Sequence, residues 1–215
     1  MQGATHDEVR HPLFARVYMR LAQAADGRGG AEHRRELLAG ASGRVLEIGA
    51  GAGANFAHYP PTVTEVTALE PERHLRERAR QAASHAPVTV SVSDGHASRL
   101  PFQEASFDVG VASLVLCTVP DQPLALGELF RVIRPGGELR FYEHVRARKP
   151  GEARVQDLAD ATFWPRIAGG CHLGRDTAAA IADAGFALES FRRFAFSPSR
   201  YLPPAAHILG TARRR

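Results

Sequence analysis

Apolar positions along the chain alternate between helical spacing and short continuous runs. In residues 1–43 they recur at intervals of three and four, which predicts a helix interrupted at 26–30 and a second helix over 31–38. From residue 44 onward, short apolar runs bounded by Gly, Pro and Asp predict strands. The expected strands are 44–48, 64–69, 88–92, 107–113, 138–142, 186–196 and 206–213. The expected helices are a short one that ends before Pro60, then 72–83, 124–133, 152–165 and 176–184.

This alternation predicts an α/β fold with a mostly parallel sheet and helices on both faces. Right-handed crossovers place the carboxyl ends of parallel strands at one edge of the sheet, where ligands bind. The last two strands have no helix between them and are expected to form an antiparallel pair at a sheet edge. The expected architecture is therefore a Rossmann-like sheet of seven strands. Residues 1–43 form an N-terminal helical segment and residues 44–215 form the main domain, within a single compact unit.

Composition narrows the functional classes. The chain has 215 residues, enough for one such domain, and a net charge of +4 that is carried almost entirely by arginine. Because no aromatic residues are interleaved with the basic ones, we expect no nucleic-acid partner. The sequence shows no apolar run of membrane length and no signal-peptide core, so we expect a cytoplasmic protein without a stable membrane anchor. Cys117 and Cys171 form no CxxC pair, so we expect no metal and no disulfide.

The most informative stretch is VLEIGAGAGANF, which begins at residue 45. Here an apolar strand runs directly into a turn that contains Gly49, Gly51 and Gly53. Glycines let the backbone turn tightly and approach a ligand closely, so a strand, this turn and a following helix predict a nucleotide cradle. Glu47 favours a ligand with positive charge, because its carboxylate would repel a pyrophosphate. S-adenosylmethionine, with an ammonium and a sulfonium, fits this requirement.

The glycine pattern alone also fits a dinucleotide-binding turn. Glu70, at the end of the second expected strand, stands where a ribose-binding carboxylate is found in proteins that bind either ligand. An NAD-dependent oxidoreductase therefore remains an alternative, which Glu47 disfavours.

Further segments discriminate between the two ligands. Asp94-Gly95 follows the third strand, the segment 100–108 leads into the fourth, and Arg134-Pro135-Gly136-Gly137 precedes the fifth. Together they resemble the class I S-adenosylmethionine-dependent methyltransferases over residues 44–213. Segments 54–61, 113–119 and 131–145, with Trp164, Gly170-Cys171 and Arg175, are similar to animal methyltransferase-like proteins that methylate alkyl thiols and to their bacterial relatives. The chain differs from them at Gly169 and His172, and we expect it to have no counterpart of their N-terminal hydrophobic anchor.

The resemblance implies S-adenosylmethionine as cofactor and S-adenosylhomocysteine as product. Glu47 and the glycine turn would hold the methionine part, Glu70 the ribose hydroxyls and Asp94 the adenine. The full implied cofactor set is Glu47, Gly49, Ala50, Gly51, Gly53, Asn55, Glu70, Pro71, Asp94, Gly95, His96, Ser113 and Leu114. The N-terminal helices would cover the site as a lid.

The acceptor is expected to be a small molecule, with a thiol as the first expectation. A thiol is partly ionised near neutral pH and needs little help, whereas an alcohol or phenol needs a positioned base. His144 is the candidate base, so its replacement should impair methylation of oxygen and spare that of sulfur. The candidate pocket residues are Phe14, Tyr18, Cys117, Thr118, Phe163, Trp164 and His172. Methylation of oxygen, nitrogen or carbon on an aromatic, quinone or lipid-like acceptor, and a non-catalytic role in binding the cofactor, remain alternatives.

Overall fold

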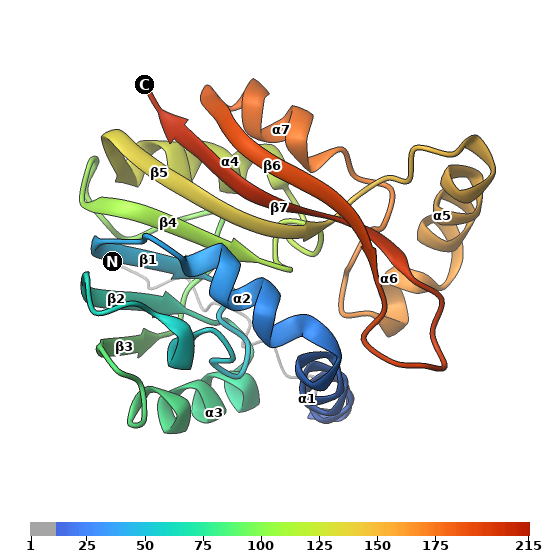
Figure 1. Cartoon of the computed structure of the whole chain (residues 1–215), viewed down its shortest axis with the longest axis horizontal. Helices are drawn as coiled ribbons and strands as arrows, with labels where there is room; N and C mark the ends of the chain where they lie inside the picture. Colours follow the sequence, from blue (N-terminus) through green and yellow to red (C-terminus); the bar gives the residue numbers. More distant parts are fainter. Residues whose placement is uncertain (1–11) are drawn as a thin grey trace, which may run out of the picture.

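The computed structural model describes residues 12–215, with side chains from residue 19 onward. Its centre is one seven-stranded sheet with the strand order β3-β2-β1-β4-β5-β7-β6 (Figure 1). The strands are β1 (Gly43–Ile48), β2 (Val63–Leu69), β3 (Thr89–Ser93), β4 (Phe107–Ser113), β5 (Ile133–His144), β6 (Phe186–Phe196) and β7 (Ala205–Arg214). The expected Rossmann-like architecture is confirmed.

Strand directions divide the sheet into two parts. The pairs within β3-β2-β1-β4-β5 are all parallel. The last two strands form an antiparallel hairpin, and β7 of this hairpin pairs antiparallel with β5. The expected antiparallel pair is therefore present, and its strand β7 lies inside the sheet while β6 forms the edge. The order reverses between β1 and β4, which is where open α/β sheets bind ligands.

Helices cover both faces of the sheet (Figure 1). Buried side chains of α4 and α7 pack on one face, and those of α2 and α3 pack on the other. Carboxylates cap three of these helices at their N-termini, since Glu72, Asp121 and Asp176 each accept a backbone N–H three residues later. The helices are α1 (Pro12–Ala25), η1 (Asp26–Gly30), α2 (Ala31–Leu38), η2 (Phe56–His58), α3 (Arg73–Ala83), α4 (Gln122–Val132), α5 (Pro150–Thr162), α6 (Trp164–Ile167) and α7 (Thr177–Asp183).

The structure corrects the expected boundaries of two elements. The helix expected over 152–165 is split into α5 and α6 after Thr162, because Pro165 has no N–H to donate and suits the start of a new helix. The strand expected over 138–142 begins at Ile133 and continues to His144. The pairing of β5 with β4 shifts register between Phe107 and Val109, which form a bulge with the facing part of β5. Gly136, in that part of β5, has a positive φ of 77°.

Two further observations concern the ends of the elements. The interruption expected at 26–30 is present, since Gly29 there adopts a non-helical φ of 113°. The short helix expected after the glycine turn is reduced to the single 3₁₀ turn η2. Among the described helices, none combines the length and the apolar character needed to cross a membrane.

Candidate functional site

The glycine turn follows β1 and lies against the loop that follows β4. Gly49 and Gly53 have positive φ values of 59° and 82°. A Cβ on Gly49 would lie 2.3 Å from a methyl carbon of Val115, and one on Gly53 would lie 2.7 Å from the ring of Phe56. Only glycine fits both positions, because each combines a left-handed backbone with a contact closer than a side chain permits.

Glu47 is the buried carboxylate of β1 and is only 2% exposed. Its two oxygens accept hydrogen bonds from Asn55 Nδ2 at 2.8 Å and from the Tyr59 hydroxyl at 2.6 Å. Burial raises the pKa of Glu47 to about 7, although both hydrogen bonds oppose this shift. Arg34 of α2 reaches the same network, donating to Asn55 Oδ1 at 3.1 Å. A ligand cation beside Glu47 would favour its ionised form.

Glu70, just beyond the end of β2, is also buried and joins two turns. It accepts from the backbone N–H of Gly51 at 2.8 Å and from that of Glu72 at 2.9 Å. Burial raises the pKa of Glu70, and these two hydrogen bonds partly offset that effect. The glycine turn and the end of β2, which are separated in sequence, are therefore adjacent in the fold.

Arg76 of α3 connects the ends of β2 and β3. Its Nη1 donates to the carbonyl oxygens of Glu70 and Pro71 and to Asp94 Oδ1, at 2.7, 2.8 and 3.1 Å. Asp94 keeps 57% of its side chain exposed, so this carboxylate remains accessible to a ligand. Gly95 and His96 follow Asp94 directly, and the backbone of His96 forms an isolated antiparallel β-bridge with that of Arg99.

The end of β4 contributes two unusual features. The Ser113 hydroxyl oxygen is buried and has no hydrogen-bond partner among the described residues. Leu114 has a positive φ of 56°, which is rare for a residue with a branched side chain, and donates its N–H to Tyr142 O at 2.7 Å.

These features fit S-adenosylmethionine. A left-handed glycine turn, a buried carboxylate for an ammonium, a second carboxylate beside the turn, an accessible aspartate and an unpartnered hydroxyl all lie at the carboxyl ends of β1 to β4. The predicted cofactor residues are thus gathered along one edge of the sheet. Ala50 belongs to the same cluster, since its N–H donates to Leu69 O at 3.0 Å.

A second cluster lies next to this edge, beyond the ends of β4 and β5. It contains Cys117, His144 and Cys171, and each sulfur lies 3.6 Å from His144 Nδ1. Both thiols are buried, while His144 is partly exposed. The sequence did not predict this cluster, because the two cysteines form no CxxC motif. They lie in distant parts of the chain, and the fold brings them together.

The electrostatics of this thiol cluster are strongly coupled. Hydrogen bonding from Cys117, followed by the contacts with His144 and with the Trp164 indole, lowers the pKa of Cys171 to about 5. The same contact between the sulfurs raises the pKa of Cys117. Burial disfavours the charge on His144, but the contact with Cys171 outweighs it and raises the pKa of the imidazole. Cys171 is therefore the thiol that ionises first.

Glu143 fixes the loop that carries Cys117. It is fully buried and accepts the backbone N–H groups of Val115, Leu116 and Cys117 at 3.0, 2.9 and 3.1 Å. Burial raises the pKa of Glu143 to about 7. Since His144 follows on the same strand, β5 positions both the loop and the imidazole.

The remaining candidate pocket residues are placed as follows. Thr118 Oγ1 lies 3.6 Å from Cys117 Sγ, and the His172 N–H donates to Cys117 O at 2.8 Å. The Trp164 indole nitrogen is buried, with no oxygen or nitrogen acceptor in the described part of the chain. Phe163 is 52% exposed. Phe14 and Tyr18 lie in the part of α1 before residue 19, whose side chains are not described.

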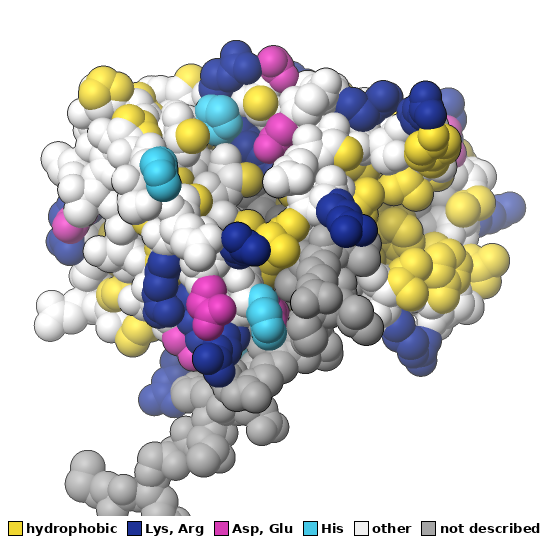
Figure 2. Space-filling model, turned by 90° about the horizontal axis from the view of Figure 1, so that it is seen from below, with side chains coloured by type: hydrophobic (Ala, Val, Ile, Leu, Met, Phe, Trp, Pro, Cys, Tyr) yellow, Lys and Arg dark blue, Asp and Glu magenta, His cyan; other side chains and the backbone are white. Residues whose placement is uncertain are grey.

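Exposed apolar side chains gather where α5, α6 and the β6–β7 loop form one end of the molecule (Figures 1 and 2). They include Val155, Leu158, Phe163, Ile167 and Tyr201.

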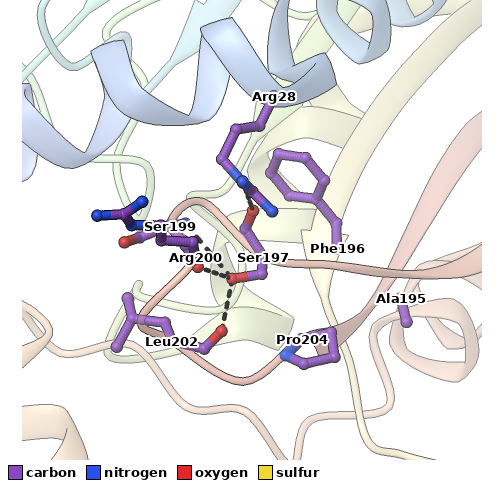
Figure 3. Close-up of a pocket in the computed structure, with 8 residues that line it drawn as sticks. All are labelled: Arg28, Ala195, Phe196, Ser197, Ser199, Arg200, Leu202 and Pro204. Carbon is purple, nitrogen blue, oxygen red and sulfur yellow. Dashed lines mark hydrogen bonds between the residues drawn. The ribbon is translucent and has the colours of Figure 1, made fainter.

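A pocket of about 360 Å³ opens between η1 and the β6–β7 loop (Figure 3). Arg28 lines one side of it and donates to Ser197 O at 3.3 Å. Phe196 lines the pocket and lies 5.8 Å from the ring of His207, which lies 4.4 Å from the ring of His144. Ring contacts thus lead from this pocket to the thiol cluster.

Several residues of the two clusters were not predicted from the sequence. They are Arg34, Tyr59, Arg76, Glu143 and, as a site residue, Cys171. Tyr59, Glu143 and Cys171 lie within segments that carried the family resemblance, which was the available signal. Nothing in the spacing of the two arginines indicated that they would be buried and bridge between elements.

Comparison with known proteins agrees with this geometry. Residues 46–141 match the family described as a methyltransferase domain. The human thiol S-methyltransferase TMT1B is 36% identical over 181 residues, which cover 81% of this chain and 73% of that protein. Human thiol S-methyltransferase TMT1A is 34% identical over 168 residues, covering 73% and 68% of the two chains. A crystal structure of a SAM-dependent methyltransferase from Thermotoga maritima superimposes with a TM-score of 0.68 at 22% identity, covering 94% and 97%.

Proposed function

The chain belongs to the S-adenosylmethionine-dependent methyltransferases, in the family that includes the thiol S-methyltransferases, and we propose on this premise that it methylates the sulfur of a small thiol. The observation that carries the proposal is the extent of the similarity. The methyltransferase domain match spans residues 46–141, whereas the match to TMT1B spans 181 residues. The match to TMT1B therefore extends beyond the cofactor-binding part of the chain. The additional residues belong to the part with the thiol cluster or to the N-terminal helices.

We propose the following roles for the residues at the carboxyl ends of β1 to β4, which we call the cofactor edge. Glu47 and the glycine turn hold the methionine part, because a buried carboxylate favours a ligand ammonium. Glu70 binds the ribose hydroxyls and Asp94 the adenine, with the backbone of Gly95 and His96. Ser113 and Leu114 line the sulfonium. Residues 1–43 act as the lid, which Arg34 joins to the glycine turn through Asn55.

Bound S-adenosylmethionine supplies a methyl group on a sulfonium that is already activated for displacement. The protein must therefore align the acceptor and exclude water more than it must activate the donor. The acceptor side of the site lies beyond β4 and β5, where His144 is the only partly exposed member of the thiol cluster. A thiol acceptor suits this place, since it ionises near neutral pH without a strong base.

A matched panel of acceptors tests the proposal. Purified protein is given S-adenosylmethionine with a simple alkyl thiol, the alcohol of the same carbon skeleton, thiophenol or phenol. We expect the methyl thioether of the alkyl thiol to form in step with S-adenosylhomocysteine, quantified by mass spectrometry, and no ether from the alcohol. Turnover of phenol without turnover of either thiol would favour methylation of oxygen instead.

The same experiment addresses the non-catalytic alternative. Calorimetric titration first shows whether the protein binds S-adenosylhomocysteine. Tight binding without transfer to any acceptor in the panel would contradict the proposed activity and favour a role in cofactor binding alone.

A further inference from the structure

The thiol cluster has the composition of a metal site. Cys117 Sγ, His144 Nδ1 or Nε2 and Cys171 Sγ lie within 4.8 Å of one another. Two thiols and one imidazole are ligands that zinc prefers. All three side chains come from different parts of the chain, and each is held in place by its own surroundings.

The distances favour a shared metal over separate hydrogen bonds. Bonds of about 2.3 Å to sulfur and 2.0–2.1 Å to nitrogen, spread at the tetrahedral angle, place sulfur and nitrogen about 3.6 Å apart. Both sulfurs lie 3.6 Å from the same atom, His144 Nδ1. One ring nitrogen has a single hydrogen or a single lone pair, so it cannot form a good hydrogen bond with both thiols at once.

The surroundings of the cluster also suit metal ligands. Three backbone N–H groups bound to Glu143 fix the loop that carries Cys117. The buried Trp164 indole N–H lacks an oxygen or nitrogen acceptor in the described chain and lies against the Cys171 sulfur. Donors of this kind orient thiolate ligands from the outer shell of a metal site.

The number of ligands indicates what the site does. Structural zinc sites have four protein ligands, whereas catalytic sites have three and keep one position open. The group found among the described residues has three. It also lies beside the cofactor edge, because Ser113 pairs with Tyr142 and His144 follows two residues later on the same strand.

We propose that Cys117, His144 and Cys171 form a zinc site with one open position, which takes the sulfur of the acceptor thiol. This inference rests on the proposed function, and it replaces the expectation that loss of His144 would spare methylation of sulfur, because His144 is here a ligand of the zinc. The acceptor thiol loses its proton to solvent as its sulfur binds zinc, and the sulfur lone pair then forms the new bond to the methyl carbon. The electron pair of the broken bond stays on the former sulfonium sulfur, which becomes a neutral thioether. The methylated acceptor is also a neutral thioether, binds zinc weakly and leaves.

Metal analysis of the purified protein tests the site itself. We expect one zinc per chain after dialysis against zinc, and a sulfur-to-cobalt charge-transfer band when cobalt replaces it. Cys171→Ala should lose zinc affinity by more than about 100-fold, beyond the 10–100-fold typical of outer-shell changes. His85→Ala, which removes an exposed imidazole just beyond the C-terminus of α3, should bind zinc as the wild type does.

Two results would overturn the metal site. One is wild-type protein with free thiols that takes up no zinc, and the other is a Cys117–Cys171 disulfide in a non-reduced peptide map. If Cys171→Ala fails to fold, as judged by loss of S-adenosylhomocysteine binding, Trp164→Phe replaces it. That variant keeps all three ligands and should bind zinc about tenfold more weakly; unchanged affinity would count against the site.

Activity separates this inference from the proposed function. Removing zinc with a chelator should abolish methylation of the alkyl thiol, and adding zinc should restore it. Full activity of the zinc-free protein would refute the inference and leave thiol methylation standing. Zinc bound at one equivalent with no methylation of any thiol would refute the proposed function and the activating role together, and leave only the metal site.

Discussion

At the scale of single residues, the cofactor edge contains two buried carboxylates, Glu47 and Glu70, that form no ion pair with another described residue. Glu70 is the clearest case, because two backbone N–H groups from two different turns converge on it. Glu70 thus joins the glycine turn to the segment after β2, and it is also the carboxylate proposed to bind the ribose. Its two roles can be separated by measuring cofactor binding and folding independently.

We predict that Glu70→Ala weakens binding of S-adenosylmethionine by about 1–3 kcal/mol, the cost of losing a hydrogen bond to a charged group. Calorimetric titration measures the effect. Glu77→Ala is the matched control, since Glu77 is an exposed carboxylate on α3 that pairs only with Arg73 in the described structure. Equal affinity of the Glu70 variant and the control would refute the ribose assignment.

Glu47 predicts a pH dependence of stability. Its pKa is 4.5 when unfolded and about 7 when folded, so the folded state binds the proton more tightly. The free energy of unfolding should therefore fall as pH rises from 4.5 to 7 and level off above 7. One pKa unit corresponds to about 1.4 kcal/mol, which limits the contribution of Glu47 to about 3.5 kcal/mol.

Glu143 and Glu70 shift in the same direction, so a variant is needed to isolate Glu47. In Glu47→Gln the loss of stability between pH 5 and pH 8 should be smaller by about 2–3 kcal/mol than in the wild type. Denaturant unfolding without cofactor at both pH values measures it. Glu65→Gln, at an exposed position of β2, should retain the full wild-type dependence. The same dependence in both variants would show that Glu47 is ionised in the folded protein.

At the scale of elements, α2 is tied to the glycine turn by Arg34. This arginine is buried and bridges Asp26 of η1 to Asn55, which in turn binds Glu47. A chain of hydrogen bonds thus runs from the N-terminal helices to the carboxylate proposed to hold the ligand ammonium. The proposed lid would then contribute to cofactor affinity through its position.

We predict that Arg34→Ala weakens cofactor binding about tenfold, because Asn55 loses the contact that orients it toward Glu47. A tenfold loss corresponds to about 1.4 kcal/mol, close to the lower end of the roughly 1.5–3 kcal/mol typical of a hydrogen bond to a charged group. Arg35→Ala is the control. Arg35 follows Arg34 directly in α2, but its side chain is exposed and pairs with Glu32 on the surface. The measurement is again calorimetric titration. A tenfold effect in both variants would mean that α2 as a whole is disturbed.

Most helices and strands could be predicted from the sequence, and two of them could not be placed correctly. The strands were predictable because their apolar runs end at glycine, proline or aspartate, and the topology then placed the cofactor residues at one edge. The start of β5 was missed because Pro135-Gly136-Gly137 ordinarily ends an element, while here it forms a bulge after which pairing resumes. The split between α5 and α6 depends on one residue, Pro165, within an otherwise helical pattern.

The acceptor side was less predictable for a physical reason. Cys117 and Cys171 meet because β4, β5 and the segment after α6 converge, and no periodicity or spacing encodes that convergence. Arg34 and Arg76 likewise had the pattern of solvated charges, yet the fold buries them against backbone carbonyls and carboxylates. Local patterns predicted elements and one ligand-binding edge, whereas contacts between loops required the structure.

At the scale of the whole molecule, the cofactor would contact the carboxyl ends of four neighbouring strands at once. Its proposed ligands come from β1, β2, β3 and β4 and are linked to α2 and α3 through Arg34 and Arg76. A ligand that binds only this folded arrangement must stabilise the entire domain by mass action.

We therefore predict that S-adenosylhomocysteine at 100 times its dissociation constant stabilises the protein by about 2.7 kcal/mol. For a chain of this size, this corresponds to a rise in Tm of about 5–10 °C. Thermal unfolding followed by circular dichroism measures the shift, and adenosine at the same concentration controls for binding of the nucleoside alone. In Glu70→Ala at the same ligand concentration the shift should become smaller, because occupancy falls with affinity. A wild-type Tm unaffected by the ligand would contradict the assembly of the cofactor site from these four strands.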